Sequence, residues 1–346
     1  MKILKLAIYK TYAIINSNKH LKRFKPVVEA ADEFFFGTDK VTLFTPHIED
    51  GIDIKRYMSF VIIGLLPATI ASIYFFGPRV IAMIAVSYIF GGLTEVVFSA
   101  VRRKPVHEGF LVTGLIFPLV LPPLVPLWMV ALGVVFGVMF GKEVFGGTGR
   151  NIFNPALVGR VFVSLAFPSV FSASWKMPLS DTITSATPLV GFKSAHAIPD
   201  LYSLLLGSQP GSIGEVFRIG IIAGGIFLIL VKIIDWRIPL SYLGMVFIFA
   251  SLGNKMNPEV FAPAAFQLLA GGLLFGAFFM ATDPVTSPFT KTGRWVYGIL
   301  LGVITVSIRS LSGFVEGVMF SILLMNAFAP LIDTIVVNLR FKEIRK

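Results

Sequence analysis

The chain contains no cysteine among its 346 residues. Disulfide bonds, cysteine-ligated zinc and thiolate-bound iron–sulfur clusters are therefore excluded. The four histidines are scattered without the spacing of metal ligands, which indicates ordinary loop histidines. The sequence also lacks a Walker A loop, and no G-x-G-x-x-G segment follows a strand pattern. A redox role would therefore need a partner that supplies the electrons.

Charged residues are scarce as well. Asp, Glu, Lys and Arg make up 14% of the chain, whereas ordinary globular proteins contain about 25%. Hydrophobic residues make up 55%, which is more apolar surface than a soluble fold of this size can hide in one core. A lipid bilayer accepts apolar surface from every side. The composition therefore predicts an all-α polytopic membrane protein.

About ten transmembrane helices are predicted, because a spanning helix needs roughly 20 mainly apolar residues. The candidate spans are residues 58–76, 80–101, 109–121, 126–143, 155–172, 215–234, 238–253, 263–281, 295–309 and 315–338.

Basic residues give the chain a formal charge of +11. If the N-terminus is cytoplasmic, most of the 30 lysines and arginines fall in cytoplasmic segments, as the positive-inside rule requires. We therefore predict that both termini lie in the cytoplasm, and we expect no nucleic-acid binding. The expected location is a bacterial inner membrane.

The spans divide the chain into two groups of five around one long loop. We predict a cytoplasmic extension at 1–56, a first five-helix half at 57–172, an external loop at 173–214, a second half at 215–339 and a cytoplasmic tail at 340–346. Because five is odd, duplicated halves would have inverted topology.

Two segments predict irregular backbone at membrane depth. Three glycines lie between Lys142 and Pro155, and Asn154 and Pro155 form a cap and first turn typical of a helix start. Phe279–Pro284 predicts a similar break after the eighth span. Such segments either line a cavity that binds an anion or a polar ring edge, or only pack against protein.

Carboxylates inside a membrane are expensive and often functional. Glu95, which follows Gly91 and Gly92, lies most plainly within a span. It either belongs to an ion path or quinone pocket, or is paired with a neighbouring charge. Glu143 and Asp283 are further candidates for a sodium path.

Three stretches carry a resemblance to a known family: Gly141–Arg160, Pro210–Glu215 and Phe279–Pro284. They resemble NqrB, a membrane component of the bacterial sodium-translocating NADH:quinone oxidoreductase, in a family that overlaps with RnfD of the Rnf ferredoxin–NAD complex. Pro46–Arg56 favours the quinone-reductase branch, whereas the Thr-Ser-Pro at 286–288 and the short length lean towards Rnf.

The resemblance implies flavin mononucleotide (FMN) joined through its phosphate to a threonine. The family's attachment motif matches Asp181, Thr184, Ala186 and Thr187, with Ser185 at the usual glycine position. Thr187 is thus the implied acceptor, although Thr182, Thr184 and Ser185 also offer hydroxyl groups. A flavin transferase would act on this loop at the external face.

The resemblance also implies a non-covalent riboflavin near Asn151 and Asn154, and a quinone site near Gly91, Gly92 and Glu95. The expected function is an electron relay from a partner flavoprotein to quinone, coupled to sodium transport within a complex that has another FMN-carrying subunit. The alternatives are an Rnf component, a flavin-free channel or transporter for a small solute, and a membrane anchor for redox partners.

Overall fold

The computed structural model describes residues 10–11, 25, 28, 54–102, 109–180 and 186–342, with only the backbone of residues 54 and 55. Most of the predicted N-terminal extension lies outside the described residues. The same is true of residues 343–346 of the tail, and of Asp181, Thr184 and Ser185 in the attachment motif.

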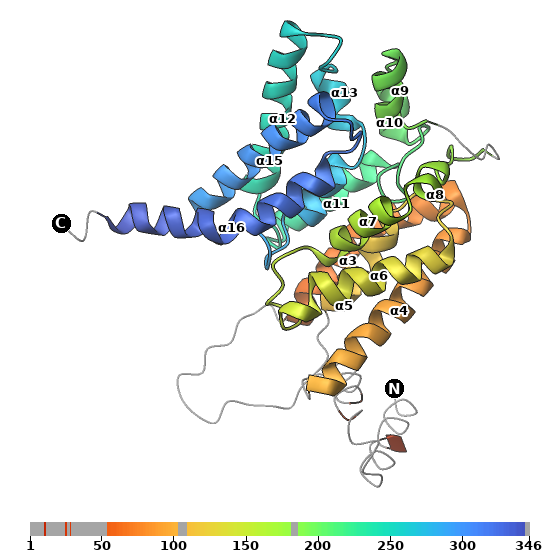
Figure 1. Ribbon diagram of the computed structural model, residues 1–346, viewed down its shortest axis with the longest axis vertical. Helices are drawn as coiled ribbons and strands as arrows, with labels where there is room; N and C mark the ends of the chain where they lie inside the picture. Colours follow the sequence, from red (N-terminus) through yellow and green to blue (C-terminus); the bar gives the residue numbers. More distant parts are fainter. Residues whose placement is uncertain are drawn as a thin grey trace.

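The described residues form helices joined by turns and loops, without strands (Figure 1). The helices are α3 (Ile54–Phe76), α4 (Arg79–Arg102), α5 (Gly109–Leu119), α6 (Leu127–Gly141), η2 (Glu143–Phe145), α7 (Pro155–Ala166), α8 (Pro168–Ala173), α9 (Pro188–Ala195), α10 (Leu201–Leu206), α11 (Arg218–Leu230), α12 (Arg237–Met256), α13 (Ala264–Leu269), α14 (Leu273–Phe275), the π-helix η3 (Gly276–Met280), α15 (Lys291–Leu311) and α16 (Val318–Phe341).

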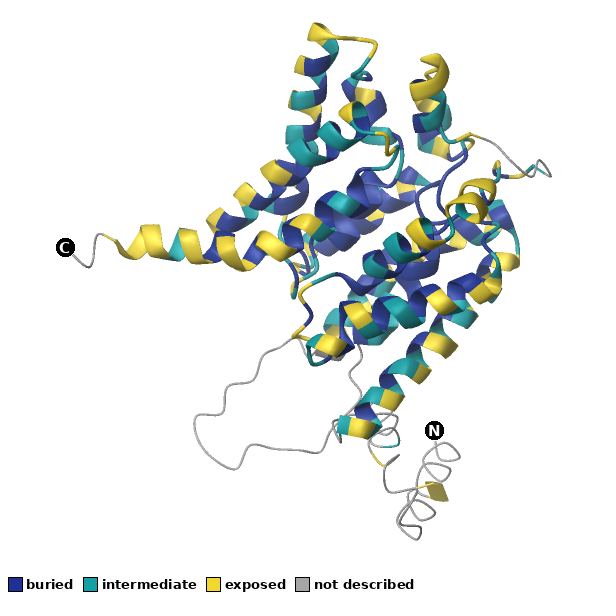
Figure 2. Cartoon of the chain, in the orientation of Figure 1, coloured by how far each residue is buried: buried dark blue, intermediate teal, exposed yellow. Residues whose placement is uncertain are grey.

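Several helices are built to face lipid. Five are long and apolar enough to cross a membrane, in α3, α4, α6 with η2, α15 and α16, and α5, α7 and α11 are shorter apolar helices. Their outward faces carry large apolar side chains such as Ile70 and Leu93, which are 63% and 56% exposed. The buried residues run through the middle of the bundle (Figure 2). The predicted class, an all-α polytopic membrane protein, is confirmed.

Helices α3 and α11 pack side by side in opposite directions. Near the start of α3, the Tyr57 hydroxyl donates to the carbonyl of Ile233, just beyond the end of α11 (2.6 Å). Near the end of α3, Ser72 donates to the carbonyl of Ile213, before the start of α11 (2.7 Å). We call the end of the bundle at Ile213 the loop side and the end at Ile233 the tail side. By the predicted topology, the loop side is external.

The helix packing repeats between the two groups of five spans. Helix α4 packs on α5 and α6, and α6 on α7; likewise α12 packs on α13 and α15, and α15 on α16. With α3 antiparallel to α11, this repetition supports two inverted halves. The boundaries of the halves remain a prediction.

Two predicted spans are each interrupted. Span 155–172 is divided at Phe167 into α7 and α8, because Pro168 disfavours helical backbone at the residue before it. Span 263–281 is divided at Ala270–Gly272 into α13 and the α14–η3 segment. Gly271 has a φ of +66°, which only glycine adopts freely. The prediction of continuous helices was wrong at both places.

Candidate functional site

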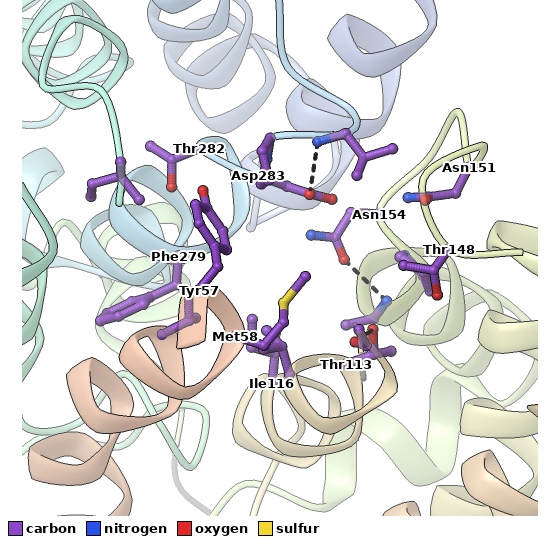
Figure 3. A pocket seen from close by; sticks show the side chains of 18 of the residues that line it. Tyr57, Met58, Thr113, Ile116, Thr148, Asn151, Asn154, Phe279, Thr282 and Asp283 are labelled. Atoms are coloured by element: carbon purple, nitrogen blue, oxygen red, sulfur yellow. Dashed lines mark hydrogen bonds between the residues drawn. The ribbon is translucent and has the colours of Figure 1, made fainter. Parts of the chain in front are cut away.

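A pocket of about 80 Å³ lies on the tail side, between the two groups of spans. Its walls come from the start of α3, from α5, from the start of α7 and from the segment after η3 (Figure 3). Apolar side chains such as Met58, Ile116 and Phe279 form part of the lining, and the polar groups are few. Such a combination is typical of a binding site for a small organic molecule.

Asn154 is fixed at the pocket by its role as helix cap. Its Oδ1 accepts hydrogen bonds from the N–H groups of Ala156 (3.1 Å) and Leu157 (3.4 Å), so the predicted cap at the start of α7 is confirmed. Because Oδ1 is used in this way, the Nδ2 group is the part of Asn154 that remains to donate towards the pocket (Figure 3). The side chain is buried.

Asn151 presents the complementary group. Its Nδ2 donates to the carbonyl of Phe153 (3.3 Å), which leaves Oδ1 as an acceptor at the pocket wall. Thr148, at the same wall, contributes a hydroxyl group. The two asparagines and the threonine thus offer both donors and acceptors to a polar ring edge.

The glycine-rich turn that carries these residues needs its glycines. Gly146, Gly147 and Gly149 have φ angles of 120°, 94° and 85°, a region that other L-residues rarely adopt. The turn lets the chain reverse between α6 and α7 while it holds Asn151 and Asn154 at the pocket. The segment therefore lines a cavity, and the binding of an anion or a polar ring edge there stays a prediction.

Asp283 also lines the pocket and lies in the segment that follows η3, beside Asn154 in Figure 3. It accepts hydrogen bonds from the N–H of Val285 and the hydroxyl of Thr286, both at 3.2 Å. A π-helix within an α-helical segment often marks a functional site. Here η3 precedes the turn that places Asp283 at the pocket.

Glu95 is paired, as one of the two interpretations of the sequence holds. Its carboxylate accepts a hydrogen bond from Lys142, and the side chains of both are only 4% exposed. Glu143 is held by Arg102 at 2.9 Å. Lys142 lines the pocket whereas Glu95 does not, so Lys142 stands between this carboxylate and the cavity.

Gly91 and Gly92 have a packing role on α4. A Cβ atom at Gly91 would lie 3.0 Å from the side chain of Val134, and one at Gly92 would lie 3.0 Å from the ring of Phe110. Neither glycine lines the pocket. The structure therefore brings together Asn151, Asn154 and Asp283, and it keeps the predicted quinone candidates apart from them. In the described residues, no three His, Asp or Glu side chains are arranged to hold a metal ion.

Thr187 lies on the loop side, away from the pocket. It occupies the N-cap position of α9, but its hydroxyl does not cap the helix and makes no hydrogen bond within the described part of the chain. Helix α9 is held in place by Lys193, whose Nζ donates to the carbonyls of Ser312 and Phe314, each at 2.7 Å. The acceptor implied by the resemblance is thus an unengaged hydroxyl on an anchored helix.

A family model described as "NQR2, RnfD, RnfE family" matches residues 41–342. The chain belongs to the NQR2, RnfD, RnfE family. The family's description covers both branches considered from the sequence, and the match includes the pocket, the loop with Thr187 and both groups of spans.

Curated relatives of this family member are named as the NqrB component of Na(+)-translocating NADH-quinone reductase. They include proteins from Pseudomonas aeruginosa (strain LESB58), Azotobacter vinelandii and Yersinia pestis, at 37%, 38% and 36% identity. Each alignment covers 93% of this chain and 94% of the relative.

The sequence did not predict every residue of the pocket. Tyr57, Thr113, Thr148 and Thr282 all line the pocket, but nothing in their local sequence distinguishes them from other polar residues near helix ends. In the sequence, Lys142 marks only the start of the glycine-rich segment. A search for polar residues that flank the glycine-rich turn would have found Lys142 and Thr148, whereas Tyr57 and Thr282 reach the site only through the packing of α3 and η3.

Proposed function

We propose that this protein is the flavin-bearing component of a membrane NADH:quinone reductase, which relays electrons from a partner flavoprotein to quinone and couples the transfer to sodium transport. The observation that carries the proposal is the unengaged hydroxyl of Thr187 at the start of an anchored helix. The names of the relatives favour this branch over the RnfD role in an Rnf complex.

The start of α9 suits a phosphoester. The first hydrogen bond inside the helix is donated by the N–H of Gly191 to the carbonyl of Thr187 (2.9 Å). The N–H groups of Leu189 and Val190 therefore have no partner within the helix, and Pro188 has no N–H. Free N–H groups at a helix start favour a phosphate. A phosphate on the Thr187 oxygen would lie beside them.

The tail-side pocket suits the polar edge of a riboflavin ring. Nδ2 of Asn154 can donate and Oδ1 of Asn151 can accept, which matches the alternating carbonyl and N–H groups of a flavin's pyrimidine edge. The cavity of about 80 Å³ is smaller than a three-ring flavin. A neighbouring cavity of about 610 Å³ shares Asn151, Pro284 and Val285 with it, so a ring held at the asparagines has room to extend there.

Bound flavins would supply the electron-transfer chemistry, and the chain would position and insulate them. Lys193 and the α9 helix would fix the external group, while Asn151 and Asn154 would orient the internal one. Sodium coupling requires a site whose ion affinity differs between two states. Asp283 is our candidate for the part of the ion path at the pocket. Glu95 and Glu143 are further candidates, and they lie on the far side of Lys142 from the pocket.

The quinone is proposed to approach from the α4 side. The outer face of α4 carries an apolar groove lined by Phe90, Leu93, Thr94, Val97, Phe98 and Val135, and Gly91, Gly92 and Glu95 lie on the same helix. The remaining partners would be the other subunits of the complex, including an FMN-carrying one, and a flavin transferase. We place the complex in a bacterial inner membrane with both termini of this chain in the cytoplasm.

Replacement of Asn154 by aspartate separates its two roles. Asp keeps the oxygen that caps α7, so the helix start should be retained. It loses the Nδ2 donor and adds a negative charge, so we expect loss of non-covalent flavin from the purified complex. Flavin extraction followed by chromatography measures the flavin content. Full riboflavin content in Asn154→Asp would remove Asn154 from the site.

The function is tested by assays on the complex purified from its host and reconstituted in liposomes. We expect NADH-dependent quinone reduction that is accompanied by sodium uptake into the vesicles. Electron transfer between ferredoxin and NAD without quinone reduction would instead indicate the Rnf branch. Passage of a small neutral solute through a flavin-free protein would indicate a channel, and unchanged turnover after loss of both flavins would indicate a membrane anchor.

A further inference from the structure

Five ionisable side chains meet inside the bundle towards the loop side. Arg160, Arg218 and Arg309 are 3%, 1% and 3% exposed, and Glu215 is 5% exposed. The Glu316 side chain is 16% exposed and is paired with Arg309 at 3.1 Å. We call these five residues the buried charge cluster. Charges at such depth are expensive and need a physical reason.

Two of the arginines hold the broken helix together. Arg218 donates to the carbonyls of Leu269 and Leu204, both at 2.7 Å. Arg309 donates to the carbonyls of Gln267 (2.7 Å) and Ala270 (3.0 Å). The carbonyls of Gln267, Leu269 and Ala270 lie at the end of α13 and have no partners within the helix, so both guanidinium groups have a structural role at the break.

Glu316 binds the other side of the same break. One of its oxygens accepts from the N–H of Gly272 (3.2 Å), just before α14, and the other accepts from Arg309. Arg309 and Glu316 thus bridge the gap between α13 and α14. The structure explains the burial of these two charges by the hydrogen bonds that they provide to a helix interrupted within the membrane.

Arg160 has no such role. Its closest polar contact is the hydroxyl of Ser212 at 3.5 Å, the limit of a hydrogen bond, and its Nε has no partner. Among the described residues, no carboxylate lies close enough to it to form an ion pair. The Oε2 of Glu215 is likewise unpartnered. Arg160 lies close enough to Glu215 and Glu316 to attract both carboxylates. Among the described residues, however, it forms no direct ion pair and caps no helix, and burial of an arginine with so few contacts costs several kcal/mol.

Three of the five charges converge on one glycine. A Cβ atom at Gly272 would lie 3.2 Å from Oε2 of Glu215, 3.8 Å from Nη1 of Arg160 and 4.0 Å from Oε2 of Glu316. Arg160 comes from α7 in the first group of spans, whereas Gly272 and Glu316 belong to the second. The guanidinium of Arg160 therefore lies at the seam between the two groups.

The cluster and the tail-side pocket lie at opposite ends of one short segment. The chain runs from Gly272 through α14 and η3 to Asp283 at the pocket, roughly 16 Å if helical throughout. Between them, the ring of Phe275 lies 5.2 Å from that of Phe279, which lines the pocket. A Cβ atom at Gly214, next to Glu215, would lie 3.1 Å from Phe275. The cluster therefore lies at the loop-side end of this segment, and the pocket lies at its tail-side end.

The charge balance at this end is positive. Three arginines face two glutamates, so the buried charge cluster carries one excess positive charge when all five groups are ionised. In a medium of low dielectric constant, a fixed positive charge raises the energy of a nearby sodium ion strongly, and membrane pores use such charges to exclude cations.

We propose that Arg160 is a cation barrier, which prevents sodium ions from crossing passively along the seam between the two groups of spans. The proposal rests on the proposed function, because only an ion-transporting complex needs such a barrier. Arg218 and Arg309 have a structural role through their hydrogen bonds. The barrier would explain the burial of Arg160, which has no such role.

The test is passive entry of radioactive sodium into liposomes that contain the complete complex, without NADH. Arg160→Gln should raise the entry rate by roughly tenfold or more, because it removes the excess charge. Lys255→Gln is the matched control, since Lys255 is an exposed charge at the loop-side end of α12, and it should leak no more than the wild type. Arg160→Lys keeps the charge and should also leak little.

Glu215→Gln provides an independent arm, because it makes the cluster more positive and should leave the entry rate at or below the wild-type value. A wild-type rate in assembled Arg160→Gln contradicts the barrier. If that variant does not assemble, increased entry in Arg160→Lys or Glu215→Gln contradicts the barrier, and wild-type entry in both supports it. NADH-driven turnover is measured separately, so failure of the proposed function shows as an inactive wild type, not as an unchanged leak.

Discussion

Thr187→Val is expected to abolish covalent flavin on this chain, seen as complete loss of flavin fluorescence from its band on a denaturing gel. Valine has nearly the shape of threonine but no oxygen on which a phosphoester can form. The Thr187 hydroxyl makes no hydrogen bond among the described residues, so its removal should leave the anchoring of α9 intact. The variant therefore reports on the attachment chemistry and not on folding.

Thr290→Val is a control for this experiment. Thr290 is also an N-cap threonine, but its oxygen accepts from the N–H of Gly293 (3.1 Å) and its hydroxyl bonds to Asp333. Its replacement should lower the thermal stability by the loss of a cap, about 1 kcal/mol, and leave the fluorescence unchanged. Thr182→Val and Thr184→Val test the competing hydroxyls. A fluorescent band from Thr187→Val would show that another residue carries the flavin.

Lys142→Met is expected to be strongly destabilising. It leaves Glu95 buried at 4% exposure without its partner, and breaking a buried ion pair from one side costs about 3–5 kcal/mol. We expect a large fall in the thermal unfolding temperature of the purified complex, or loss of assembly. Arg102 already pairs with Glu143, so it is not free to replace the charge of Lys142 beside Glu95.

The double variant Glu95→Gln/Lys142→Met distinguishes a packing effect from an electrostatic one. With both charges removed, the uncompensated carboxylate is gone, so most of the stability lost in Lys142→Met should return. If the double variant is as unstable as Lys142→Met, the pair does not account for the effect. Quinone reduction in the rescued protein then shows whether the Glu95–Lys142 pair has a role beyond stability.

The sequence was sufficient for features that depend on local pattern. Apolar length located the spans, because lipid-facing helices must satisfy their own backbone groups. The Asn154–Pro155 cap was recognised because its hydrogen bonds join neighbouring residues. The break at Gly271 and Gly272 was missed, since an apolar window around two glycines looks the same for a continuous helix as for a broken one.

Contacts between distant residues were beyond the sequence. The partner of Glu95 is Lys142, 47 positions away, and only the packing of α4 against α6 brings them together. The convergence of Arg160, Glu215 and Glu316 on Gly272 likewise depends on how the two groups of spans meet. The sequence therefore indicated charged residues whose position in a span needs an explanation, and the fold shows the partners that explain it.

The central claim is that a flavin is joined through phosphate to Thr187. The most direct measurement is mass spectrometry of the peptide covering residues 173–214, prepared from protein matured in its native host. The account predicts a peptide heavier by one flavin mononucleotide less water, with fragment ions that assign the added mass to Thr187. An unmodified Thr187 in catalytically active complex would contradict it.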